Sequence, residues 1–385
     1  MNKLEKYSLH SALQPSRPTL NECFFPIKND SYISYNIDRS STSRFYFHWQ
    51  EVVDLINPYL QREGISIIKI GDANSPQLHG TLNYSGKTFN QDLYILKRSM
   101  LHFNAFDYFT YLCDFYEKPN VSLFSSTTSS KEKFLKPDIK KFIDSPKLGK
   151  SPSLIDQENP KTIDNICPAN VAHDILNLLG IKNELGSYRM IHFGESSHLK
   201  MVEVIPDFKC EHNFYPKSII NIRADLYHDE SLIASFCSDK RRIGLITKKP
   251  LSQNFLYKFR AYLNKVVIYV EDSIDNDFIL NLKKFNINYQ LVCINESSIS
   301  NLRCLHIDED IELWKPPKKK DLDIPEDICN NLFFNTSKVM HSKSGKFNSK
   351  AHWVTGEQQE VLSKVIDVAD FWEDSDFYYI YEKNR

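Results

Sequence analysis

Apolar residues recur along the chain with two spacings that alternate. Between Phe45 and Leu60 they recur every three to four residues, which predicts an amphipathic helix ended by Gly64. The β-branched run at residues 65–70 then predicts a buried strand. The same alternation continues through a helix at 91–100, a strand at 101–104, a helix at 105–116 and a strand at 121–124. Short joins between helix and strand predict a parallel-sheet α/β unit.

A second alternation occupies the middle of the chain. It predicts strands at 201–205, 219–222, 243–247, 266–270 and 289–294, with helices at 230–237, 251–264 and 277–285. This periodicity is that of a second Rossmann-like sheet. A helix is also expected at 167–179, and a short one near 327–334.

These patterns divide the chain into five segments. They are a polar N-terminal segment (1–40, with a strand-like patch at 32–35), an α/β domain (41–145), a linker and helix (146–180), a second α/β domain (181–310) and a C-terminal extension that packs back on the domains (311–385). The predicted fold class is therefore α/β with two Rossmann-like domains. A ligand is expected outside the carboxyl ends of the strands, in the crevice between the domains.

Composition narrows the function classes. The 48 Lys and Arg residues against 49 Asp and Glu give a net charge of -1, which excludes nucleic-acid binding by bulk charge. The eight cysteines form no CxxC pair, which excludes a zinc ribbon or a thioredoxin motif. In a chain of this length with ample apolar content we expect them to be reduced, and we expect no metal site. The amino terminus has no signal-peptide pattern and no apolar run reaches about 20 residues. We therefore expect a cytoplasmic protein without a transmembrane segment.

A Gly86-Lys87-Thr88 turn precedes the helix expected at 91–100. Five residues separate Gly80 from Gly86, where the Walker pattern has four, so the turn is not a P-loop. A Gly-Lys-Thr turn at a helix N-terminus still offers backbone N–H groups, a hydroxyl and an ammonium to a phosphate. The alternative is an exposed Thr88 cap beside a solvated Lys87.

Read together, two segments resemble a known family. GKTFNQDLYILKRSMLHFNAFDYFTYLCDFYEKPNVSLFSSTT is similar to the donor-binding half of the heptosyltransferase-like glycosyltransferases of family 9, and FHWQEVVDLINPYLQREGISIIKIG resembles that family's Trp-containing helix and following strand. The resemblance spans residues 44–137. It implies a GT-B fold, a nucleotide-sugar donor as substrate, no cofactor, no metal, and a glycan, lipid-linked or other hydroxyl acceptor.

The chain departs from this family in two respects. Where the family has Asp-Ser/Thr-Gly followed by His, this chain has Asp107-Tyr108-Phe109-Thr110 and no His before Cys113. Tyr108 or Phe109 would crowd the spot left by the missing glycine, so the donor pocket is either rebuilt or no longer binds a nucleotide sugar. The donor half also comes first in the chain. The second α/β domain then either serves as the acceptor half in permuted order or is something else.

The resemblance implies a set of donor-binding residues. Cationic groups and a helix N-terminus would stabilise the diphosphate leaving group, and Gln91 and Asp107 would contact the donor's base or sugar hydroxyls. The candidates for the phosphates are Arg44, His48, Gly86, Lys87 and Thr88. Surface hydrogen bonds for Arg44 and His48, and a helix-dipole role for Asp107, are the alternatives.

An inverting transfer also needs a carboxylate base. Glu195, in a loop with His198, and Asp225, just past the strand at 219–222, are the candidates; a solvated loop acid is the alternative for both. The sequence thus predicts a metal-independent glycosyltransferase. The rival is a non-catalytic GT-B-like scaffold that binds glycan or a protein partner.

Overall fold

The structure, a computed structural model, describes residues 20–38, 41–125, 137–146, 161–186, 188–197, 199–210, 218–237, 242–322, 324 and 331–383. The chain forms two compact units, which divide between Met190 and Ile191. No helix within the described ranges is long and apolar enough to cross a membrane.

The first unit is built on a six-stranded sheet. Its order is β3-β2-β1-β4-β5-β6, and every strand pair is parallel. The strands are β1 (Tyr32–Tyr35), β2 (Ser66–Lys69), β3 (Leu82–Asn83), β4 (His102–Ala105), β5 (Asn120–Phe124) and β6 (Lys140–Asp144). The order reverses between β1 and β4, which makes the carboxyl ends of these two strands a topological switch point.

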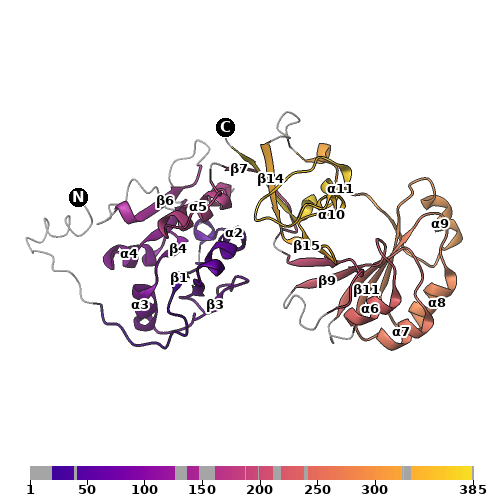
Figure 1. Cartoon of the computed structure of the whole chain (residues 1–385), viewed down its shortest axis with the longest axis horizontal. Helices are drawn as coiled ribbons and strands as arrows, with labels where there is room; N and C mark the ends of the chain where they lie inside the picture. Colours follow the sequence, from indigo (N-terminus) through magenta and orange to yellow (C-terminus); the bar gives the residue numbers. More distant parts are fainter. Residues whose placement is uncertain are drawn as a thin grey trace, which may run out of the picture. The chain divides into compact units, whose positions relative to one another are not determined.

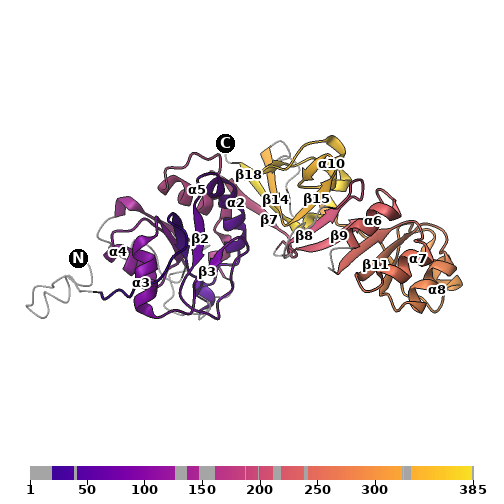
Figure 2. The same ribbon diagram turned by 60° about the horizontal axis from the view of Figure 1, so that its bottom comes forward.

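Helices cover both faces of this sheet (Figures 1 and 2). They are α2 (Trp49–Arg62), α3 (Phe89–Arg98), α4 (Tyr108–Phe115) and α5 (Pro168–Leu178). α2 packs with α5 on one face, and α3 packs with α4 on the other. Because each strand runs towards the same edge, the N-termini of α2, α3 and α4 gather at the carboxyl edge of the sheet.

The second unit contains an eight-stranded sheet of order β13-β12-β11-β10-β9-β8-β15-β16. Its strands are β8 (Met201–Val204), β9 (Ile219–Arg223), β10 (Ile243–Thr247), β11 (Leu263–Val270), β12 (Tyr289–Cys293), β13 (Ile311–Leu313), β15 (Lys338–Ser342) and β16 (Gly345–Phe347). Only the β15–β16 pair is antiparallel. Four helices connect β9 to β13: α6 (Glu230–Cys237), α7 (Gln253–Phe259), α8 (Asn276–Lys284) and α9 (Ile299–Leu305).

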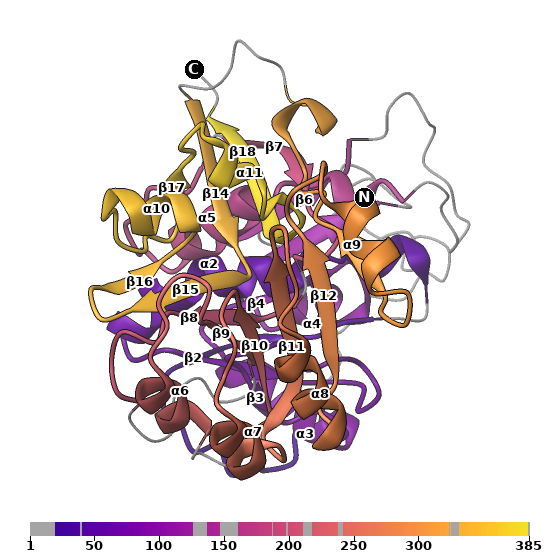
Figure 3. The ribbon, with the colours of Figure 1, turned by 90° about the vertical axis from the view of Figure 1, so that its right-hand side faces the viewer.

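Strands β8 to β13 follow one another across the sheet in the order of the sequence. Right-handed connections that always advance in one direction place their helices on one face, and Figure 3 shows α6, α7 and α8 side by side. The alternation in β10 agrees, since Leu245 lies in the helix-covered core and Ile246 is only half-buried. The order reverses between β8 and β15, because β15 pairs in parallel with β8 on the side opposite β9, so this sheet too has a switch point.

The C-terminal part adds a four-stranded sheet of order β17-β14-β18-β7. It comprises β7 (Tyr188–Phe193), β14 (Leu332–Thr336), β17 (Ser363–Lys364) and β18 (Tyr378–Lys383), with α10 (Lys350–Thr355) and α11 (Ala369–Trp372) beside it. Its core is aromatic, with Phe334 packed edge-on against Phe371 at 4.7 Å between ring centroids. Short 3-10 helices are η1 (Thr42–Arg44), η3 (Pro137–Ile139), η4 (Ile163–Asn165), η5 (Lys319–Asp321) and η7 (Ser375–Phe377).

The predicted α/β class with two parallel-sheet units is confirmed, and the boundaries differ from those expected. The first unit takes in β1, placed in the polar N-terminal segment, and α5, placed in the linker, because both pack into its core. The C-terminal residues belong to the second unit, where β15 extends its large sheet. The helix expected near 327–334 is wrong in its described part: residues 332–334 lie in β14, which pairs with β18.

Candidate functional site

The switch point of the first sheet is closed by a hydrogen bond between two loops. Asn36 follows β1 and Asp107 follows β4, and the Asn36 Nδ2 donates to Asp107 Oδ2 at 2.6 Å. The other carboxylate oxygen accepts from Asn104 Nδ2 at 2.7 Å and from the Phe109 N–H at 2.8 Å, so Asp107 caps α4. Burial raises the pKa of Asp107 to about 6, although the hydrogen bonds from these donors act to lower it. Asp107 was predicted to contact the nucleotide-sugar donor, but both of its carboxylate oxygens already accept hydrogen bonds within this unit.

Behind Asp107 a chain of polar side chains runs into the buried sheet. His102 on β4 contacts Ser34 Oγ through Nδ1 and Asn36 Oδ1 through Nε2, each at 2.9 Å. Since the Asn36 amide nitrogen donates to Asp107, its oxygen must accept, and His102 carries its proton on Nε2. Burial lowers the pKa of His102 to about 3, which keeps the ring neutral. The chain therefore runs in one direction, from the Ser34 hydroxyl to the Asp107 carboxylate.

The Gly86-Lys87-Thr88 turn lies at the same edge, ahead of α3. The Gly86 N–H donates to the Gly71 carbonyl just past β2 at 2.8 Å, which fixes the turn against the sheet. Thr88 and Gln91 form a capping box, with Thr88 Oγ1 accepting from the Gln91 N–H and Gln91 Oε1 from the Thr88 N–H. Both side chains thus serve the helix end. Lys87 is exposed, with its Nζ 5.3 Å from the centre of the Phe25 ring.

Asp92, in the first turn of α3, is a polar group that sequence reasoning missed. Its side chain is buried, with 4% of the residue exposed. The Gly71 backbone N–H donates to its carboxylate, while Oδ1 has no hydrogen-bond partner among the described residues. Burial raises its pKa to about 6. An acid in a first turn is ordinarily explained by the helix dipole, so only its burial distinguishes Asp92.

Two aromatic rings border the same edge. Phe89 opens α3 and Tyr108 opens α4; their ring centroids lie 6.3 Å apart, and about half of each residue is exposed (47% and 52%). Phe109 instead points into the core, where its ring would lie 3.3 Å from a Cβ placed on Gly71. The ring that fills the space beside the sheet is therefore Phe109, while Tyr108 stays at the surface.

The field at this edge is mainly negative. Burial raises the pKa of Tyr108, and so do four carboxylates, those of Asp107, Asp92, Asp38 and Asp72. Arg44, a predicted donor contact, lies 3.6 Å from Asp38. His48 occupies the N-cap position of α2, makes no side-chain capping hydrogen bond, and has 2% of its surface exposed. Its Nε2 is 3.1 Å from the Asp164 carbonyl oxygen, and burial lowers its pKa to about 4. His48 is thus a neutral interior group.

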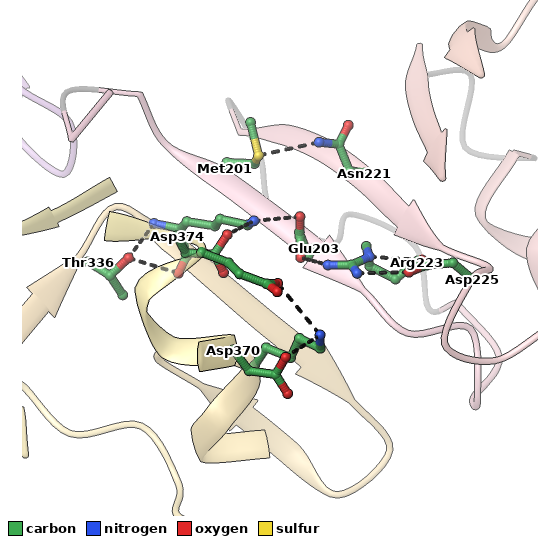
Figure 4. A network of polar contacts seen from close by, with 11 residues as sticks. Met201, Glu203, Asn221, Arg223, Asp225, Thr336, Asp370 and Asp374 are labelled. Atoms are coloured by element: carbon green, nitrogen blue, oxygen red, sulfur yellow. Dashed lines mark hydrogen bonds and ion pairs between the residues drawn. The ribbon is translucent and has the colours of Figure 1, made fainter. Parts of the chain in front are cut away.

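In the second unit, Asp225 belongs to a buried chain of alternating charges (Figure 4). Arg223 donates from Nε and Nη2 to both Asp225 oxygens, at 2.9 and 2.8 Å, and from Nη1 to Glu203 at 2.6 Å. Lys338 continues the chain, 2.7 Å from Glu203 and 2.6 Å from Asp374. The base role of Asp225 stays a prediction, and in this network its oxygens already accept from a guanidinium.

The other predicted base, Glu195, is exposed in the turn that follows β7. Its suggested partner His198 lies outside the described residues.

In the charge chain, the neighbours of Glu203 decide its ionisation. Burial alone would raise the pKa of Glu203, but Lys338 and Arg223 hold that pKa below its usual range. Within the described ranges, no group of three or more His, Cys, Asp or Glu is placed to hold a metal ion.

No protein-family model matches this chain, and no curated protein matches it in sequence. Solved structures similar to it include Escherichia coli ADP-heptose lipopolysaccharide heptosyltransferase II (15% identity, TM-score 0.30, 46% of this chain and 50% of that one). A family 9 glycosyltransferase from Veillonella parvula (16%, 0.31, 46% and 50%) and the E. coli heptosyltransferase TibC, in complex with ADP-D-β-D-heptose (13%, 0.34, 43% and 49%), are also similar.

One of these structures is a family 9 glycosyltransferase, and the other two are heptosyltransferases. The chain spans about half the length of each of them, 49–50%. At 13–16% identity the similarity concerns the fold.

Proposed function

We propose that this chain is a metal-independent glycosyltransferase whose first unit binds a nucleotide-sugar donor at the carboxyl edge of its sheet. The observation that carries the proposal is the buried Asp92 carboxylate, with its unpartnered Oδ1, five residues along the chain from the exposed Lys87. A buried acceptor without a partner is costly, and a ligand hydroxyl would satisfy it.

Two chemistries thus lie near the start of α3. Lys87 and the first N–H groups of the helix suit a phosphate, and Asp92 suits a hydroxyl. A ligand that carries both, a few ångströms apart, is a phosphorylated sugar such as the ribose diphosphate of a nucleotide sugar. The exposed Phe89 and Tyr108 rings next to this turn offer apolar faces to a base or a sugar ring.

In this proposal Lys87 stabilises the charge that grows on the diphosphate as the glycosidic bond breaks. Electrostatic stabilisation of a leaving group by a fixed cation and a helix N-terminus needs no metal. Gln91 and Thr88 act indirectly, because their side chains hold the helix end in place. Arg44 can add charge from the loop after β1. Glu195 and Asp225 remain the proposed bases for a glycan or other hydroxyl acceptor.

A second candidate is favoured by the state of the switch point itself. Asp107 is fully hydrogen-bonded inside the unit, Phe109 occupies the space beside Gly71, and four carboxylates surround Tyr108. A donor pocket closed in this way fits a non-catalytic scaffold that binds glycan or a protein partner.

The two candidates differ in nucleotide binding. Titration calorimetry against UDP, ADP, GDP, their sugar conjugates and inorganic pyrophosphate should find at least one ligand that binds the wild type. Lys87→Ala should weaken both that nucleotide and pyrophosphate about tenfold or more, because a charged hydrogen bond is lost. Asp92→Asn should weaken the nucleotide and leave pyrophosphate unchanged.

Lys141→Ala is the matched control. Lys141 is exposed on β6, at the edge of the sheet opposite β3, and lies 3.4 Å from Asp174, so its loss should leave both affinities as they are. No binding of any nucleotide by the wild type would exclude the transferase and leave the scaffold. Binding without release of the sugar to any tested acceptor would show a nucleotide-binding scaffold.

A further inference from the structure

An extended N-terminal segment, residues 20–27, lies along α3; we call it the strap. At the last turn of the helix, the Glu22 carboxylate is 2.6 Å from Lys97 Nζ and 3.2 Å from Arg98 Nη1. Near the first turn, the Cys23 N–H donates to the Asn90 carbonyl at 3.0 Å. The strap is therefore attached at both ends of the helix that carries the proposed phosphate turn.

Beyond Cys23 the strap enters the core of the first unit. Phe25 and Ile27 pack against the cluster formed by β1, β2, α3 and α4. The Phe25 ring lies 5.3 Å from the Tyr84 ring, centroid to centroid, and the Lys87 ammonium is 5.3 Å from the centre of the same Phe25 ring. One side of Phe25 is thus fixed by apolar packing, and its π-face is available to Lys87.

We propose that Phe25 is a positioning residue for the Lys87 ammonium, so that the strap sets the affinity of the Gly86-Lys87-Thr88 turn for a diphosphate. The inference rests on the proposed function, which gives that turn its ligand. An exposed lysine has many rotamers, and fixing it at the moment of binding costs entropy. A cation held at an aromatic face has already lost part of that freedom.

Phe24 provides an internal comparison. It is the neighbouring residue in the strap and is 72% exposed, and its ring packs edge-on against Tyr94 at 5.4 Å. Tyr94 lies on α3 one turn beyond the capping residues. Phe24 therefore lies in the same strap and packs on the same helix as Phe25, but its ring contacts Tyr94.

The test uses the full chain with two substitutions, Phe25→Leu and the control Phe24→Leu. Leucine keeps the apolar volume that packs against Tyr84 and removes the π-face. Reductive methylation with ¹³C-formaldehyde labels the lysines while keeping their charge, and Lys87→Arg assigns the Lys87 signal. An aromatic ring shifts the resonance of a group over its face, so this signal reports the contact without any ligand. Titration calorimetry with the tightest nucleoside diphosphate then gives the affinity.

We expect the wild-type Lys87 methyl signal to be shifted upfield, and to return to the position of free lysine in Phe25→Leu alone. The dissociation constant for the nucleoside diphosphate should rise about two- to fivefold in Phe25→Leu, the scale of an exposed cation–π contact. Phe24→Leu should match the wild type in both measurements, and an unchanged melting temperature would show that both variants fold.

Two results would overturn the inference while leaving the proposed function standing. One is an unshifted Lys87 signal in the wild type. The other is an unchanged dissociation constant in Phe25→Leu despite loss of the shift. If the wild type binds no nucleoside diphosphate at all, the proposed function fails, and the inference fails with it.

Discussion

Asn36 and Asp107, 71 residues apart in the chain, join the loops after β1 and β4 through a hydrogen bond of 2.6 Å. Asn36 also accepts from His102 on its other side, so its carboxamide is held at both ends. The place where a doubly wound sheet usually opens to a ligand is here tied together by protein groups.

Asn36→Ala should lower the free energy of unfolding by roughly 2–4 kcal/mol. The substitution leaves His102 Nε2–H without its acceptor and removes one donor from the buried Asp107 carboxylate. Urea denaturation of Asn36→Ala, Asp107→Ala and the double variant would measure the coupling. We expect a coupling energy above about 1 kcal/mol, since both residues belong to one network. Strictly additive effects would contradict the network.

His102 should make stability depend on pH in the acid range. Burial lowers its pKa in the folded state to about 3, against about 6.5 in an unfolded chain. The unfolded state then binds the extra proton between these values, so the His102 contribution is complete above pH 6.5 and is lost as the pH falls towards 3. His102→Gln should reduce the slope of stability against pH, by up to about 1.4 kcal/mol per pH unit between pH 6 and 4.

Asp107 acts in the opposite sense over part of this window. Its folded-state pKa is raised to about 6, so its contribution is complete below its unfolded value near 3.9 and is lost as the pH rises through 6. Comparing His102→Gln with the wild type at each pH cancels this background. If the stability of His102→Gln and of the wild type changed in parallel with pH, His102 would not be a buried neutral ring.

The charge chain of the second unit should be sensitive to the loss of one member. Lys338→Met removes the cation between Glu203 and Asp374 and leaves both carboxylates with less compensation. Burial alone would lower the pKa of Lys338, but these two carboxylates hold it above its usual value. We expect a loss of about 3–5 kcal/mol in urea denaturation.

Lys350→Met is the matched control, because Lys350 pairs with Asp370 at 2.8 Å and is more exposed. It should cost about 1 kcal/mol or less. Similar losses of unfolding free energy for the two variants would show that burial does not make the charge chain more important for stability.

Gly71 should tolerate a side chain less well than Gly64. It adopts φ +84°, and an added Cβ would lie 3.3 Å from the Phe109 ring. Gly64 has a similar φ of +67° and no atom within 4 Å of an added Cβ. Gly64→Ala should therefore cost only the backbone strain, about 1–2 kcal/mol, and Gly71→Ala should cost more in thermal or urea unfolding. Equal losses would mean that Phe109 moves aside without penalty.

Elements with a clear local period were predictable from the sequence. The helix at Glu230–Cys237 and the strand at Ile243–Thr247 lie where their patterns place them. Leu332–Thr336 was missed because its strand partner, β18, lies more than 40 residues further along the chain. β6 was hidden by its polar sequence: Lys140 is buried in a strand because it pairs with Asp114 on α4. Such long-range partners override local propensity.

The site was predictable in kind and only partly in detail. The sequence placed Lys87 at a turn before a helix, and the structure agrees. The sequence predicted that Asp107 contacts a ligand, because a sequence alone does not show that Asn36 and Asn104 both donate to this carboxylate. The sequence did not single out Asp92, because both its burial and its hydrogen bond from the Gly71 N–H, 21 residues away, arise only in the fold.

The sequential strand order of the second unit gives its large sheet a weak end. Each βα turn packs chiefly on the turns before and after it, so the outermost one, α9 with β13, rests on a single neighbour. α9 buries only Leu302 and β13 has three residues. Fraying and proteolytic cleavage should therefore start at this end, and amide protection should rise strand by strand towards β9.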